Sequence, residues 1–557
     1  MSDDNTGIHA EPEKYASQIV STTKDNNVID VEEFGEKNSP NSSSINSRSQ
    51  EQPEPVTTRM ELWAWYFYYF GNNSAGTLSY APLIFQYILS LASVDSEDHS
   101  LPCGDGACVV QFGSRWTNID TVVLISNGIV FAFQAFFLIC FGSMADYGPV
   151  KRWVLIFWTV VCWATQFAFL GLQDASQYRA AIGVYIITYL SYNLCQAFWT
   201  PGLPLLARNT PESVQAKQEY ASGDITEDEY QGRVMLQRNK LSNYAFGAMS
   251  IGYTLTLIIA LGAAFGLHAN DSTQNNIRAA VVIVGIATGV WIVFGTPWFF
   301  IEKNRSNKLE VPLPAGSGKQ STFAEARQYV VTGLKVYWNV LKHIPHLTQT
   351  WLYLVGFFLI SDGFATTNQI YGIAQNTIVS YSTTTSTELY IVQGFSNLVG
   401  IAIFWLIQRH FRIRTKTILI VNCIFVILNA VWGCIGIGTT KFGLHNTWEV
   451  WAYSVFNCAF AAPFTAFTAT MLSDLCPKGR EVTFFSLYSL VSKSTAWIGP
   501  IISGIIIDRT GSTWKGFPFA LGMSVVGFVL ICLVDVKKGQ EECERYVKLD
   551  TTLMNDE

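Results

Sequence analysis

Twelve apolar segments of about twenty residues or more dominate the chain of 557 residues. A helix of about twenty residues crosses the hydrocarbon core of a membrane and satisfies its own backbone hydrogen bonds there. The segments lie at 62–92, 120–144, 152–172, 180–207, 240–266, 278–301, 347–375, 387–408, 416–438, 449–473, 481–507 and 517–535. The sequence therefore predicts an all-α membrane protein with twelve transmembrane helices.

The composition excludes an ordinary cytosolic enzyme. Charged residues form only 14% of the chain, whereas soluble domains contain about 25%. The sequence has no glycine-rich phosphate loop followed by Lys, no catalytic-triad pattern, no metal-binding cysteine motif and no basic stripe for nucleic acid. We therefore expect a protein that is not an enzyme, with no cofactor, no metal and no nucleic-acid partner.

Lys and Arg residues set the orientation of the predicted helices, because basic residues are retained on the cytoplasmic side. The loops after the even-numbered spans contain 20 of them, and those after the odd-numbered spans contain 6. Both tails are then cytosolic. Residues 1–60 are rich in Ser, Asn, Glu and Pro, which predicts a disordered tail, and residues 536–557 form the second tail.

The longest inner loop, 302–346, divides the predicted spans into two sets of six, 61–301 and 347–535. Within it, residues 321–343 show apolar residues at helical spacing, which predicts an amphipathic helix on the membrane surface. We favour a strap between the two halves as its role. A regulatory or partner-binding segment is the alternative.

The two sets of six show matching features, as expected for parallel repeats. The first span contains Gly71–Gly76 before Tyr80, and the seventh contains Asp362–Asn368 before Tyr371, so that each has a polar centre nine residues before a Tyr. This arrangement resembles the major facilitator fold, in which the first and fourth helices of each half line a central cavity. We expect a broken backbone in both spans.

Several residues are candidates for gating. Pro201 and Pro463 lie in the fourth and tenth spans, where proline produces kinks suited to hinges. Arg480 precedes the eleventh span. The loop Gly142–Arg152 resembles the facilitator loop that locks two helices together, with Asp146 as its acidic residue. A helix cap is the alternative role of Asp146, at even odds.

Several stretches resemble the fungal autophagy-related vacuole effluxers, a family of the major facilitator superfamily. They are Pro477–Ser486, the following Lys493 and Ile498–Pro500, Ile360–Asn368, His99–Cys103 and Val534–Gly539. The resemblance extends from about residue 61 to 545. It implies export of leucine and other neutral amino acids from the vacuole lumen to the cytosol after autophagic protein breakdown. The aromatic start of the first span and Asn239 depart from the family pattern, which leaves open a paralogue with another substrate preference.

Two charged residues lie near the centres of predicted spans, Asp362 in the seventh and Lys493 in the eleventh. A charge at the bilayer centre costs at least about 2.5–3.5 kcal/mol, so each needs a partner, a wet cavity or a function. One hypothesis is that Lys493 binds the carboxylate of a zwitterion, while Asp362 binds its ammonium group or carries a coupled proton. Asn72, Asn73 and Asn368 would then be further substrate-binding residues. The alternative is that Asp362 and Lys493 form a buried structural pair that does not contact substrate, and the sequence favours neither hypothesis. Four other polar residues are predicted to join helices, with ligand binding as the less favoured alternative: Asn193, Gln196, Gln393 and Asn397.

Two modifications are predicted on the lumenal side. Cys103 and Cys108 both lie in the first outer loop, which permits a disulfide between them. Asn270 begins the glycosylation motif Asn-Asp-Ser in a short lumenal loop, and we place the odds of its modification below one half.

Three hypotheses for the function follow. The first is a secondary carrier in the vacuole membrane that moves amino acids by alternating access, with or without coupled protons. The second is a facilitator of another solute, such as a sugar, a peptide or a drug. The third is a non-transporting sensor or scaffold that binds partners through the inner loop 208–239, where Glu227, Asp228 and Glu229 cluster. Such a cluster is more often a solvated loop.

Overall fold

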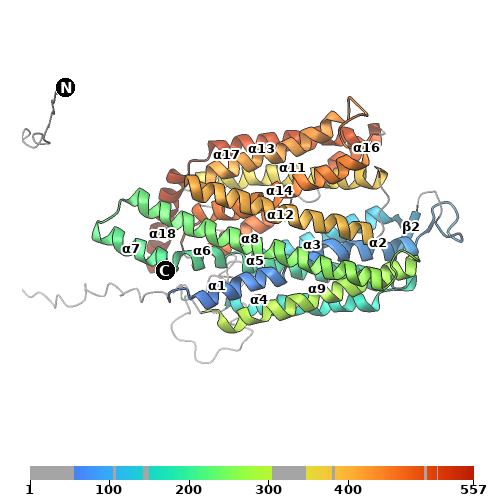
Figure 1. The fold of residues 1–557 in the computed structure, drawn as a ribbon, viewed down its shortest axis with the longest axis horizontal. Helices are drawn as coiled ribbons and strands as arrows, with labels where there is room; N and C mark the ends of the chain where they lie inside the picture. Colours follow the sequence, from blue (N-terminus) through green and yellow to red (C-terminus); the bar gives the residue numbers. More distant parts are fainter. Residues whose placement is uncertain are drawn as a thin grey trace, which may run out of the picture. The chain divides into compact units, whose positions relative to one another are not determined.

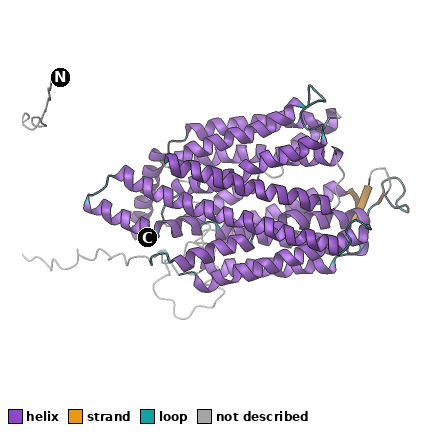
Figure 2. Ribbon diagram, in the orientation of Figure 1, coloured by secondary structure: helices purple, strands orange, loops and turns teal. Residues whose placement is uncertain are grey.

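The computed structural model describes residues 55–103, 108–141, 150–303, 331, 347–378, 383–478, 480–494, 498–510 and 512–556. These residues are mostly helical, with one small sheet at one end of the helices (Figure 2). Asp146, residues 1–54 of the predicted tail and nearly all of the predicted linker 302–346 lie outside the described residues. Lys493 lies in a described helix, but its side chain is outside the description.

The first half begins with a span in three pieces: α1 (Arg59–Gly71), the π-helix η1 (Ala75–Tyr80) and α2 (Ala81–Leu91). An antiparallel sheet follows, made of β1 (Val94–Asp95), β2 (Cys108–Phe112) and β3 (Arg115–Asn118). The other helices are α3 (Ile119–Phe141), α4 (Val150–Ala168), α5 (Tyr178–Trp199), α6 (Gly202–Arg208), α7 (Pro211–Ser222), α8 (Glu227–Gly266) and α9 (Thr273–Ile301). The sequence did not predict the sheet, because its strands are only two to five residues long.

The second half consists of helices and connecting loops in its described part. Its elements are α11 (Thr348–Ile378), α12 (Thr383–Phe411), α13 (Thr415–Ile435), α14 (Thr447–Asp474), α15 (Glu481–Ser494), α16 (Ile498–Thr510) and α17 (Phe517–Leu533). A last helix, α18 (Val536–Asp556), occupies the predicted C-terminal tail. This helix is docked: the Glu542 carboxylate accepts a hydrogen bond from the Gln349 amide at 2.9 Å, and Tyr546 is buried.

Seven helical segments among the described residues are long and apolar enough to cross a membrane. They are Lys151–Gly171, Glu227–Gly266, Thr273–Ile301, Thr384–Phe411, Thr415–Ile435, Thr447–Asp474 and Thr513–Leu533. The other predicted spans are largely helical in their described parts, and α3 contains the shorter apolar stretch Ile125–Ile139. The prediction of a mostly helical membrane protein is therefore confirmed.

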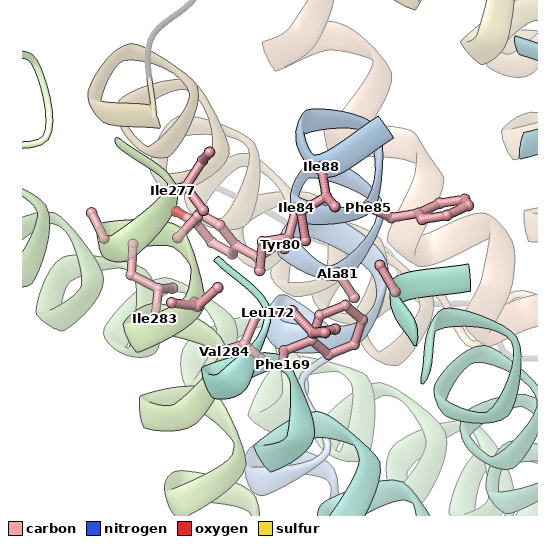
Figure 3. Packing of buried hydrophobic residues seen from close by; sticks show 14 of the residues in the cluster. Tyr80, Ala81, Ile84, Phe85, Ile88, Phe169, Leu172, Ile277, Ile283 and Val284 are labelled. Carbon is pink, nitrogen blue, oxygen red and sulfur yellow. The ribbon is translucent and has the colours of Figure 1, made fainter. Parts of the chain in front are cut away.

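Neighbouring helices pack closely along their lengths. In the first half α1 lies along α9 and α4 along α5, and in the second half α11 lies along α17. The two halves meet most extensively where α8 lies along α12 (Figure 1). One apolar core of the first half gathers η1, α2 and α9, with Tyr80, Ile84 and Ile283 among its residues (Figure 3). Since lipid tails are as apolar as these side chains, close packing is what stabilises such contacts in a membrane.

The seventh predicted span is not broken. Helix α11 continues without interruption through Asp362 and Asn368, so the expectation of an open backbone there was wrong. Gly363 instead marks a close contact between helices, because a methyl group added there would collide with Ser524 and Ala520 of α17. Small residues commonly allow membrane helices to approach in this way.

Candidate functional site

A cavity of about 330 Å³ lies between the two halves of the chain. Its wall is formed by the break between α1 and η1 together with α8, α12 and α14. The lining residues are Asn73, Ser74, Leu78, Ser79, Phe246, Met249, Ser250, Tyr253, Gln393, Asn397, Ala461, Ala462 and Thr465. None of these side chains is charged, and amide and hydroxyl groups lie beside apolar surface. The volume falls in the range of small-molecule sites, about 300–1,000 Å³.

The break in the first span is held by the side chain of Asn73. Its Nδ2 donates to the Phe70 carbonyl oxygen at 3.1 Å and to Thr256 Oγ1 at 2.9 Å, and its Oδ1 accepts from the Ala75 amide at 3.1 Å. The next residue, Ser74, has a φ of +68°, in the left-handed region that few residues other than Gly and Asn adopt. Such strain persists only where the surroundings enforce it, and here it lies in the cavity wall.

Replacing Asn73 with Ala should lower the free energy of unfolding by about 1–2 kcal/mol, because its buried partners lose their hydrogen bonds. Thermal unfolding in detergent measures this as a lower midpoint. Asn422→Ala is a matched control, since Asn422 is also buried and its amide donates to Ile418 within its own helix, at 3.1 Å. Equal losses in the two variants would contradict the proposed role of Asn73.

The second half contributes Gln393 and Asn397 to the wall, four residues apart on α12. The sequence analysis assigned both to contacts between helices, and Gln393 does make one, donating to Ser454 Oγ at 3.2 Å. The Oδ1 atom of Asn397 is buried and has no hydrogen-bond partner among the described residues. The atom has almost no accessible surface, but because an unpaired buried carbonyl is costly, rotation of the Asn397 amide toward a bound solute would gain a hydrogen bond. The sequence could have indicated this shared position in the wall, because residues four apart lie on the same face of a helix.

Asp362 is not part of this cavity lining. It is fully buried in α11 beside Gly499 of α16, where an added methyl group would lie 2.8 Å from its Oδ1 atom. Neither carboxylate oxygen has a hydrogen-bond partner within the described part of the chain. Asn368 accepts a hydrogen bond from Asn457 Nδ2 at 2.9 Å, and Asn72 is buried at the break without lining the cavity. Of the predicted substrate-binding residues, the described lining contains Asn73 alone.

Within the described part of the chain, two ion pairs with buried carboxylates join the halves at the end of the helices that carries α7 and α18 (Figure 1). Arg208 Nη1 lies 3.0 Å from Glu481 Oε1, and Arg238 is paired with Asp474. The two carboxylate side chains are only 4% and 6% exposed, so salt screens them little. The sequence analysis selected none of these four residues for gating. It selected Arg480, which precedes Glu481 in the sequence and is itself buried.

The other predicted positions are distributed over both ends of the helices. Pro201 lies between α5 and α6 and interrupts the fourth span, whereas Pro463 lies inside the continuous α14, beside two alanines of the cavity wall. Cys103 and Cys108 are joined by a disulfide, with their Cα atoms 5.5 Å apart. Asn270 is exposed in the turn between α8 and α9.

Comparison with known proteins identifies a family. The chain matches the family model described as "Vacuole effluxer Atg22 like" over residues 57–544. Autophagy-related protein 22 of Candida glabrata is 26% identical over 504 residues, which cover 85% of this chain and 89% of that protein. The protein of the same name from Kluyveromyces lactis is 25% identical over 478 residues, covering 84% and 91%.

Solved structures show the same fold at low sequence identity. A bacterial homologue of the iron transporter ferroportin, in an outward-facing state, matches with a TM-score of 0.52 at 11% identity, over 85% of this chain and 99% of that one. The proton:xylose symporter XylE of the major facilitator superfamily gives 0.51 at 13% identity, over 87% and 97%. The chain therefore shares the fold of these membrane transporters. Because the family model covers nearly all the described residues, the chain belongs to the Atg22-like vacuole effluxer family.

Proposed function

We propose that this protein is a secondary transporter of the vacuole membrane that exports neutral amino acids such as leucine from the lumen to the cytosol, and so returns products of autophagic protein breakdown. Membership of an effluxer family supports the compartment and the direction. The uncharged cavity lining carries the choice of substrate class, because its amide and hydroxyl groups face an apolar wall. A neutral amino acid is a zwitterion, so its ammonium and carboxylate groups would hydrogen-bond to these amide and hydroxyl groups while its uncharged side chain meets the apolar wall.

The proposed architecture has twelve spans in two six-helix halves, 61–301 and 347–535, joined by the linker 302–346. Both tails, 1–60 and 536–557, are then cytosolic, as are the ion pairs that join the halves near α7 and α18. The sheet and Asn270 lie on the lumenal side. The excess of Lys and Arg in the even-numbered loops supports this orientation.

Asp362 is our candidate for a coupled proton. It is a buried acid whose oxygens have no hydrogen-bond partner in the described residues, and a charged carboxylate in such a place is costly. Lys493, on the eleventh span, remains the proposed partner of a substrate carboxylate or of Asp362. In Asp362→Asn, leucine exchange should persist but should no longer respond to a lumenal pH step. This result would support the role of Asp362 as a proton carrier.

Leucine counterflow tests the proposed function. Liposomes that contain the purified protein and unlabelled leucine should accumulate radiolabelled leucine. Asn397→Leu, which fills part of the cavity and removes the unpaired carbonyl, should lower the initial rate by about tenfold. Phe395→Leu is the matched control on the same helix, because Phe395 is 60% exposed on the outer surface, and its rate should stay at the wild-type value.

The alternatives give different results in the same assay. A facilitator of another solute would show counterflow with a sugar or peptide and none with leucine. A sensor or scaffold would show no flux with any solute while remaining folded. Either result would overturn the export of amino acids as the function.

A further inference from the structure

Tyr80 and Tyr371 occupy corresponding places in the two halves, nine residues after the polar centres of the first and seventh spans. Their hydroxyl groups have different partners. Tyr371 bonds within its own half, to the Val450 carbonyl oxygen at 2.9 Å and to Ser454 Oγ at 2.8 Å. Tyr80 instead bonds across the halves, to Thr387 Oγ1 on α12 at 2.5 Å. Both Tyr80 and Thr387 are fully buried, so water does not replace this hydrogen bond.

A second hydrogen bond crosses between the halves close by. Thr384 Oγ1 donates to Asn270 Oδ1 at 3.0 Å. Thr384 precedes Thr387 by three residues on α12, so the two threonines lie on the same helix face. The start of α12 is therefore tied to the first half at the end of the molecule opposite α7 and α18.

Tyr80 is also connected to the cavity through its own backbone. It is the last residue of the π-helix η1, and Leu78 and Ser79 of the same short segment line the cavity. Ser79 Oγ lies 3.1 Å from the hydroxyl of Tyr253, which is another lining residue. A π-helix is a rare conformation that appears mostly as a single turn and often at functional sites. A shift of this turn would move the cavity wall and the Tyr80 ring together.

Buried contacts hold the turn on its other side. Gln166 of α4 donates to Thr77 Oγ1 at 2.9 Å and accepts from Thr288 of α9 at 2.9 Å. Gly76 packs directly against the Gln166 amide, because an added methyl group would lie 2.7 Å from its Oε1 atom. Figure 3 shows Tyr80 among the apolar side chains of the core, near Ile84 and Ile277.

We propose that the hydrogen bond between Tyr80 and Thr387 is a latch that closes the lumenal side of the cavity. Movement of the π-helical turn η1, whose Leu78 and Ser79 line the cavity, makes or breaks this hydrogen bond. Tyr80 acts as a gating residue through the position of η1 and does not itself line the cavity. This inference rests on the proposed alternating-access function. We assign no such role to the counterpart Tyr371, because the two described hydrogen bonds of its hydroxyl, to Val450 and Ser454, stay within one half.

Lumenal access to the cavity tests the latch. Thr465→Cys places a thiol in the wall contributed by α14, and a membrane-impermeant maleimide applied from the lumenal side of oriented vesicles measures its exposure. Tyr80→Phe and Thr387→Val should each raise the alkylation rate by about fivefold to tenfold, as expected for the loss of one buried hydrogen bond. The double variant should be no faster than either single variant, because both remove the same bond. Protein without the added cysteine gives the background.

Tyr371→Phe is the matched control and should leave the alkylation rate unchanged. The latch is excluded if folded Tyr80→Phe and Thr387→Val are alkylated at the wild-type rate, or if Tyr371→Phe accelerates labelling as much. Size-exclusion elution establishes that each variant is folded. Because labelling needs no substrate, faster labelling without leucine counterflow would support the latch and reject the amino-acid cargo. Leucine counterflow together with wild-type labelling rates in the variants would support the amino-acid cargo and reject the latch.

Discussion

Charge reversal at Arg238 is expected to lower leucine counterflow by at least about tenfold. Arg238 of α8 pairs with Asp474 at the end of α14, and their side chains are 15% and 6% exposed. Removing one partner of a buried ion pair costs about 3–5 kcal/mol, and Arg238→Glu also brings two carboxylates together. Because the pair joins the halves, this cost falls on the state in which the cytosolic end is closed. A carrier that cannot reach this state cannot complete its cycle.

Two further variants distinguish gating from a general loss of stability. The exchanged pair, Arg238→Asp with Asp474→Arg, should recover most of the lost rate, since it restores the attraction between the halves. Arg233→Glu should change the rate by less than about twofold, because Arg233 is 44% exposed and pairs only weakly with acidic residues of its own half. Wild-type flux in Arg238→Glu, or no recovery in the exchanged pair, would contradict a gating role.

The helices could be predicted from the sequence because apolar length alone defines them. The break in the first span could also be predicted, since the polar run Gly71–Gly76 interrupts its apolar sequence. The left-handed conformation of Ser74 could not, because serine rarely adopts it. The same argument failed for the seventh span. Gly363 looked like a second break, but its role is decided by a partner helix far away in the sequence, against which only glycine fits.

The contacts between the halves could not be predicted for the same reason. Arg208 and Glu481 are 273 residues apart, and nothing near either residue in the sequence identifies the other as its partner. The cavity was predicted only in part: the first and tenth spans and Asn73 are in its described wall, whereas the fifth and eighth spans stand where the fourth and seventh were expected. The absence of charged side chains from its described lining was not predicted, because the sequence analysis gave weight to the charges of Asp362 and Lys493. The sequence position of a charge does not show which face of its helix meets the cavity.

Two glycines of α8 test whether a glycine is present for close helix packing or for backbone freedom. Gly252→Ala should lower the free energy of unfolding by about 3 kcal/mol, because the added methyl group would collide with the Phe70 carbonyl oxygen of α1. That oxygen also accepts a hydrogen bond from Asn73, so α1 cannot move aside without disturbing the break. Gly247→Ala on the same helix meets no atom within 4 Å and should be neutral or stabilise the helix by up to about 1 kcal/mol.

Opposite shifts of the two unfolding midpoints would show that Gly252 is present for close packing rather than for backbone freedom. If both variants were stabilised, α1 would be free to retreat from α8, and the close contact would not hold the break. The effect on transport should follow the same order, since Phe70 lies two residues before the break, and Asn73 and Ser74 of the break line the cavity. Gly252→Ala that still folds should therefore exchange leucine more slowly than Gly247→Ala. The size of that difference measures how strongly the geometry of the break controls the cavity.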